Sequence, residues 1–66
     1  MKNLKETLSV TSNKSARTFT IRRTYSDGSM VKYRTTPMSQ EEFDIETQNT
    51  ENDWKQFLNT DGYYKV

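Results

Sequence analysis

Few side chains of this 66-residue chain could carry out covalent chemistry. The sequence contains neither histidine nor cysteine, which removes the usual general bases and the soft metal ligands. Its serines have no evident base that would activate them as nucleophiles. Glu42 and Glu46 are four residues apart, as on one side of a helix, but a divalent metal needs several more converging oxygens. We therefore expect no catalytic residue, metal or cofactor, and a protein that is not an enzyme.

Charge is divided between the two halves of the chain. Residues 1–36 hold eight Lys and Arg against two acidic residues, a net charge of +6. Residues 37–66 hold seven acidic residues against two lysines, a net charge of −5. The total of +1 therefore hides a strong asymmetry, which bears on the choice of partner more than on the fold.

The basic half predicts three antiparallel strands. Three segments alternate polar with apolar residues and are rich in β-branched and aromatic side chains: residues 7–11, 16–25 and 29–36. Between the last two, Asp27 and Gly28 favour a three-residue loop with the glycine in a left-handed conformation. That loop pairs Ile21 with Tyr33, and burial favours this register because it gathers the apolar side chains on one face.

The acidic half predicts one helix from about Ser39 to Asn59. Ser39 followed by Glu42 is a helix-capping signature, and the large apolar side chains that follow recur three or four residues apart. A kink or break near residues 49–50 is the alternative, with Thr50 and Asp53 capping a second helix. Residues 63–66 form either a short strand or a packed tail.

Together these elements predict a single small domain over residues 1–66 of the α+β class. It consists of a small three-stranded antiparallel sheet (β-β-β) with one C-terminal helix packed on one face. In topology this arrangement resembles the DNA-binding domains of phage integrases and of AP2-type plant factors, which combine three strands with a helix. The resemblance concerns the order of the elements and implies binding of nucleic acid through the sheet.

The outer face of the predicted sheet is the first candidate surface. In the favoured register it carries Arg22, Lys32 and Arg34 among exposed threonines. Arginine and lysine suit phosphates and guanine edges, and threonine offers a hydroxyl and a methyl group. Such residues are also common on a sheet face that only meets solvent.

The predicted helix is the second candidate surface, because Glu42, Glu46 and Asp53 lie off its apolar stripe. A row of carboxylates can mimic the phosphates of a nucleic acid and occupy a basic groove on another protein. Complementary charge of this kind speeds the encounter and fixes its orientation. The same residues would also suit an ordinary solvated helix face.

The leading expectation is a small non-enzymatic interaction protein of the type found in phages and mobile elements. It would bind a macromolecular partner, with a protein as the first choice, and block or modulate it through the bipolar charged surface. The alternative is a nucleic-acid-binding module that uses the basic sheet face, and a homodimer is compatible with either. The first residues contain too few apolar side chains for a signal peptide or membrane span, so we expect a cytoplasmic protein with no membrane partner.

Overall fold

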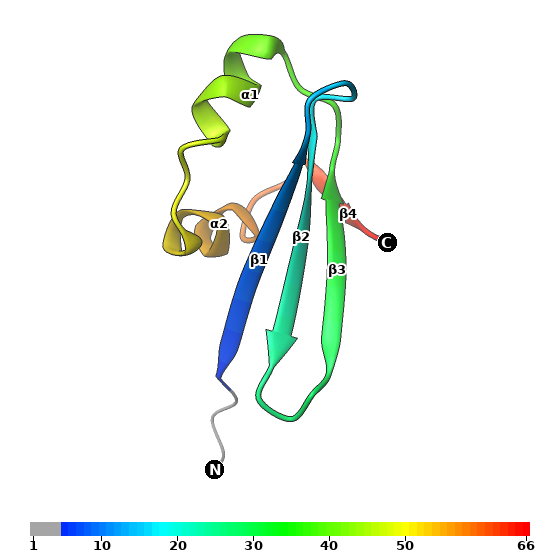
Figure 1. The fold of residues 1–66 in the computed structure, drawn as a ribbon, viewed down its shortest axis with the longest axis vertical. Helices are drawn as coiled ribbons and strands as arrows, with labels where there is room; N and C mark the ends of the chain where they lie inside the picture. Colours follow the sequence, from blue (N-terminus) through cyan, green and yellow to red (C-terminus); the bar gives the residue numbers. More distant parts are fainter. Residues whose placement is uncertain (1–4) are drawn as a thin grey trace.

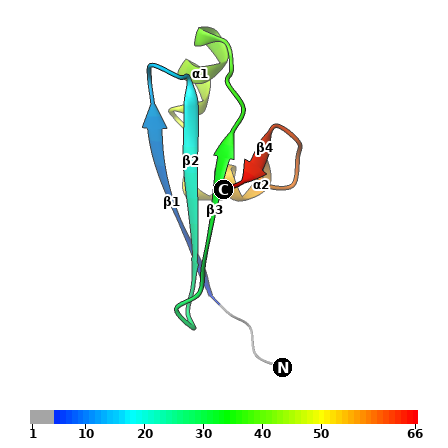
Figure 2. The ribbon, with the colours of Figure 1, turned by 90° about the vertical axis from the view of Figure 1, so that its right-hand side faces the viewer.

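The computed structural model describes residues 5–66 as a four-stranded antiparallel sheet with two short helices on one side (Figure 1). The strands, in spatial order, are β1 (Glu6–Asn13), β2 (Thr18–Tyr25), β3 (Met30–Thr35) and β4 (Tyr63–Lys65). The helices α1 (Gln40–Glu46) and α2 (Glu51–Phe57) connect β3 to β4. Figure 2 shows both helices behind the sheet and β4 at the edge beside β3.

The prediction of one C-terminal helix is wrong, because the chain forms two helices. After α1, the side chain of Thr50 begins α2 by accepting a hydrogen bond from the Asp53 N–H at 3.2 Å. The Asp53 carboxylate in turn accepts from the Thr50 N–H at 3.0 Å. This reciprocal cap satisfies two N–H groups at a new helix start, whereas a continuous helix would contain several poor helix formers at this point.

The prediction of a three-stranded sheet is also wrong, because residues after α2 form a fourth strand. Gly62 has a φ of +101°, a conformation that glycine adopts readily, and it turns the chain back toward β3. The Thr36 N–H donates to the Gly62 carbonyl, and the Val66 N–H donates to the Lys32 carbonyl. The fourth strand and the divided helix also depart from the integrase-like topology.

The hairpin between β2 and β3 has the predicted register. Ile21 pairs with Tyr33, and the Tyr25 N–H donates to the Ser29 carbonyl across the turn at 2.9 Å. Gly28 adopts a φ of +93° in that turn, as the three-residue loop requires. Phe19, Ile21 and Tyr33 therefore project from the same face of the sheet.

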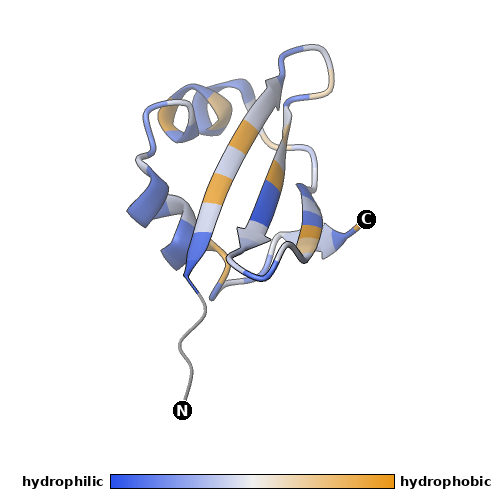
Figure 3. Ribbon diagram, turned by 60° about the horizontal axis from the view of Figure 1, so that its bottom comes forward, coloured by the Kyte–Doolittle hydropathy of each residue, from blue (hydrophilic) through white to orange (hydrophobic). Residues whose placement is uncertain are grey.

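The core between the sheet and the helices is largely aromatic. The Phe19 ring stacks on Phe43 with centroids 4.8 Å apart, and it lies 4.9 Å from the Trp54 ring. Trp54 is only 4% exposed, so its ring lies in the core. In Figure 3 the apolar residues form separate bands along the strands, as expected for a sheet with one buried face.

The sheet is longer than the helical layer that covers it. The molecule measures 42 × 20 × 18 Å, and the β2–β3 hairpin extends well past both helices (Figure 1). On the inner face of this end, the Arg23 Nε donates to the Glu6 carboxylate, and both side chains are half-buried. An ion pair thus takes the place of apolar packing there. No helix within residues 5–66 is long and apolar enough to span a membrane.

Candidate functional site

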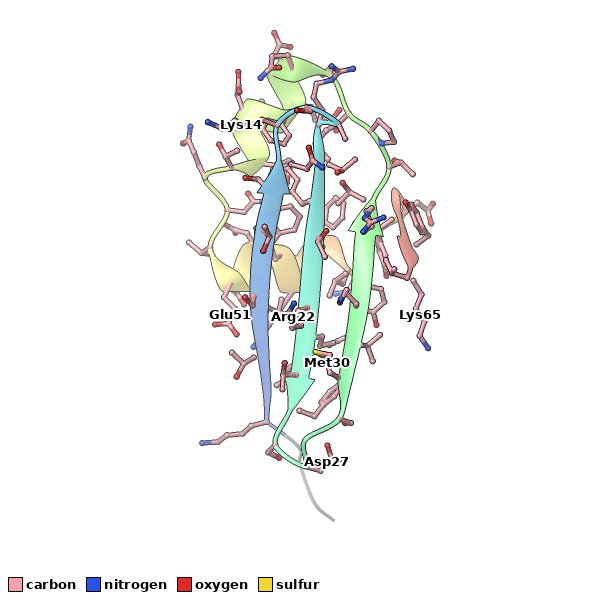
Figure 4. All side chains as sticks on the ribbon, turned by 45° about the vertical axis from the view of Figure 1, so that its right-hand side comes forward. Lys14, Arg22, Asp27, Met30, Glu51 and Lys65 are labelled. Carbon is pink, nitrogen blue, oxygen red and sulfur yellow. The ribbon has the colours of Figure 1, made fainter. Side chains whose placement is uncertain are left out.

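The sheet face opposite the helices carries the predicted basic residues, and we call it the basic sheet face. Arg22 and Lys32 lie directly opposite each other on β2 and β3, and Arg34 lies two residues further along β3. Alternation along the strands points all three away from the core. Figure 4 looks onto this face, with Arg22 and Met30 in front of the helices.

The strand residues of this face are polar or basic with few exceptions. By the strand register they are Thr7, Ser9, Thr11, Asn13, Thr18, Thr20, Arg22, Thr24, Met30, Lys32, Arg34 and Tyr64. None of these positions is Asp or Glu. Within residues 5–66, none of the three cations forms an ion pair. The basic sheet face therefore presents uncompensated positive charge to solvent.

Direct pairing of two cations is an unfavourable way to build a sheet. Like charges that lie directly opposite on neighbouring strands destabilise the pair. Arg22 and Lys32 are placed in this way, and no carboxylate of the strands lies between them. An anion bound across the two side chains would remove this repulsion.

Tyr64 extends the same face, and the sequence did not assign it there. Residues 63 and 64 point to opposite faces of β4. Tyr63 packs edge-on against Tyr33 with ring centroids 5.3 Å apart, and its hydroxyl donates to the Leu58 carbonyl. Tyr64 is 49% exposed and pairs with Arg34 across β3 and β4. Alternation along a strand turns one of two adjacent tyrosines outward, but only the pairing of β4 decides which one.

The three predicted acidic residues do not form one row, because the expected single helix is divided. Glu42 and Glu46 lie on α1, whereas Asp53 lies on α2. The Glu46 carboxylate accepts a hydrogen bond from the Asn49 Nδ2, and Asp53 is held in the cap of α2. Only Glu42 is exposed with no hydrogen bond to its side chain within the described residues.

Two carboxyl groups outside the candidate surfaces have lowered pKa values. The hydrogen bond from Arg23 lowers the pKa of Glu6, and hydrogen bonds from the Ser29 hydroxyl and N–H lower the pKa of Asp27. Glu6 lies on the inner face of the sheet and Asp27 in the β2–β3 turn, so neither belongs to a candidate surface. In the part of the chain that the structure describes, no three His, Cys, Asp or Glu side chains come together to hold a metal ion.

No protein-family model, curated protein or solved structure matches this chain. The functions proposed below therefore depend on the geometry and charge of the chain itself.

Proposed function

We propose that this chain is a small binding protein that contacts nucleic acid through its basic sheet face. The observation that supports this most is the direct pairing of Arg22 with Lys32, together with Arg34 two residues away. Phosphates along a nucleic-acid backbone can bridge these cations and relieve their repulsion. Proteins that read DNA with strands use a comparable surface. Such binding involves no chemical step.

The position of Tyr64 favours a single strand as the ligand. Its ring is 49% exposed next to Arg34 on the same face. An unpaired base can stack on an aromatic ring while its phosphates contact neighbouring cations. A duplex keeps its bases stacked inside and offers the tyrosine little contact.

The acidic half of the chain does not oppose this mode of binding. Both helices lie on the far side of the sheet from the basic sheet face (Figure 2). The helical carboxylates therefore lie on the side of the sheet away from a bound strand, except for Glu51, which reaches the edge of β1 at Leu8. Steric access to the cations is also open, since no helix of residues 5–66 crosses this face.

A protein partner bound by the acidic residues receives less support. Glu42 and Glu46 lie on α1 and Asp53 lies on α2, so the three carboxylates do not form the single row that was expected on one helix. A cytoplasmic location remains part of the proposal, because the absence of cysteine suits a reducing compartment. A homodimer stays a prediction that either mode of binding would tolerate.

Fluorescence anisotropy with labelled single-stranded DNA, single-stranded RNA and duplex DNA tests the proposal. We expect salt-sensitive binding with single strands preferred, and a slope of about −2 in log affinity against log salt, if three phosphates are neutralised. Replacing Arg22, Lys32 and Arg34 together with Gln should abolish this binding. Tyr64→Ala should weaken single-strand binding about 5- to 150-fold, the range of one base–aromatic stack, and should affect duplex binding less.

A triple variant with the same change in net charge serves as the control. Lys14, Lys55 and Lys65 lie off the basic sheet face, and their replacement with Gln should leave the affinity within about twofold and the salt slope unchanged. Absence of binding by the natural chain at low salt contradicts the proposal. An equal loss of affinity in the two triple variants contradicts it as well, because net charge alone would then explain the binding.

A further inference from the structure

Strand β1 is an edge of the sheet, and half of its backbone groups point away from β2. The Ser26 N–H donates to the Lys5 carbonyl, which places the odd-numbered residues of this segment in hydrogen bonds with β2. The N–H and carbonyl groups of Leu8, Val10 and Ser12 consequently point to the open edge.

Helix α2 closes this edge only at Leu8, near the start of β1. A carboxylate oxygen of Glu51, Oε2, accepts a hydrogen bond from the Leu8 N–H at 3.0 Å. Figure 4 shows Glu51 beside β1. Covering an edge in this way prevents pairing with another chain. Within residues 5–66 no comparable contact is made by the N–H of Val10 or Ser12. The edge at these two residues, which we call the upper edge of β1, therefore stays open.

A hollow of about 170 Å³ adjoins the open part of the edge. It is lined by Val10, Ser12, Phe19, Glu46, Thr47, Asn49 and Trp54. Two aromatic side chains supply its apolar wall, and Glu46 supplies its one charge. Pockets for small-molecule ligands generally measure about 300–1,000 Å³. The size of this hollow therefore suits a single side chain better than a cofactor.

We propose that the upper edge of β1 binds an extended peptide of a protein partner by strand addition. A lysine or arginine side chain of that peptide enters the hollow. Residues that pair directly across two strands project their side chains to the same face, and the side chains of Val10 and Ser12 face the hollow. A peptide residue paired with either one is thus aimed into it.

The chemistry of the hollow selects the basic side chain. Its cationic end can pair with the half-buried Glu46 carboxylate, while its methylene stem packs against Trp54 and Phe19. In strand addition the main-chain hydrogen bonds give affinity and the side-chain pocket gives specificity. This site is separate from the basic sheet face, so the two proposals can fail independently.

Titration of the ¹⁵N-labelled chain with a capped Thr-Val-Lys-Val-Thr peptide tests this site by NMR. We expect shifts of the Val10 and Ser12 amides and of the Trp54 indole, with none at Arg22 or Lys32. A matched peptide with norleucine in place of lysine keeps the stem without the charge, and should bind about tenfold more weakly. A peptide with glutamate at that position should not bind.

Variants of the protein separate the backbone contact from the charge. Ser12→Pro removes an N–H that faces the open edge, where proline is tolerated, and should abolish binding. Ser12→Ala keeps that N–H, so any loss it shows measures the side chain alone, and the further loss in Ser12→Pro measures the N–H. Glu46→Gln should reduce binding of the lysine peptide to the level of the norleucine peptide. Each variant should retain its nucleic-acid affinity.

Three results would overturn the proposal. They are equal binding of the lysine and glutamate peptides, shifts confined to other parts of the molecule, and undiminished binding by a folded Ser12→Pro chain. If the proline variant does not fold, the Glu46→Gln variant decides: unchanged discrimination between lysine and norleucine would exclude the hollow.

Discussion

At the scale of single residues, the ion pair of Glu6 and Arg23 makes the free energy of unfolding depend on pH in the acidic range. The hydrogen bond from Arg23 lowers the pKa of Glu6, and the pKa of Arg23 is raised in turn. Because the folded carboxyl has the lower pKa, its stabilisation is present above the ordinary glutamate pKa of about 4.3. It is lost as the pH falls through the lowered pKa of the folded state.

We expect Glu6→Gln to reduce the free energy of unfolding at pH 7 and to weaken its decline below about pH 4.3. Urea unfolding followed by circular dichroism at a series of pH values measures both effects. Asp27 contributes to the acid dependence of stability with the same sign, since its pKa is also lowered. Introducing Asp27→Asn into both the natural protein and the Glu6→Gln variant removes that contribution. If the free energy of unfolding then falls equally with acid in the Asp27→Asn proteins with and without Glu6→Gln, the ion pair is not the source of the acid dependence.

At the scale of elements, the cap at Thr50 makes α2 a separate helix. Thr50→Ala removes the hydroxyl that accepts from the Asp53 N–H and should lower the free energy of unfolding by about 1 kcal/mol. Thr47→Ala is a matched control in the same connection, because its hydroxyl donates to the Asp44 carbonyl and caps no helix start. A similar loss in both variants, measured by urea unfolding, would contradict a specific role of the cap.

The elements also show what the sequence can predict. The alternation of apolar and polar residues, together with the turn at Gly28, defines the β2–β3 register locally. The sheet face on which Arg22 and Lys32 lie could therefore be predicted without the structure. The break before Thr50 remained an alternative, because the apolar spacing of Phe43 and Trp54 also fits one continuous helix. Local signals do not distinguish the two cases, and packing of both rings against Phe19 decides between them.

The remaining site features depend on contacts between distant segments. Tyr64 joins the basic sheet face only because β4 returns to pair with β3. The Glu51 contact with the Leu8 N–H joins residues 43 positions apart, and no sequence pattern indicates it. The hollow beside β1 likewise requires the connection between the two helices to pass over the sheet.

At the scale of the whole molecule, the core is small enough for one side chain to decide folding. A chain of 66 residues has about 3–10 kcal/mol of total stability. Replacing a buried tryptophan with alanine costs about 3–5 kcal/mol. We therefore expect Trp54→Ala to leave the chain largely unfolded at 37 °C, as far-UV circular dichroism would show. Tyr64→Ala, on the exposed face, should stay folded, and a folded Trp54→Ala chain with an unchanged urea midpoint would contradict this view of the core.

The overhang of the sheet beyond its helices divides the molecule into two zones of local stability. Around Ile21, which is fully buried, the sheet is covered by helices on one face and paired with strands on both sides, so its amide protons should exchange with solvent only when the whole chain unfolds. At the β2–β3 turn the strands extend past both helices (Figure 1), and the ion pair of Glu6 and Arg23 lies at this end. That end can fray while the rest stays intact. The unit that folds cooperatively is therefore shorter than the sheet itself.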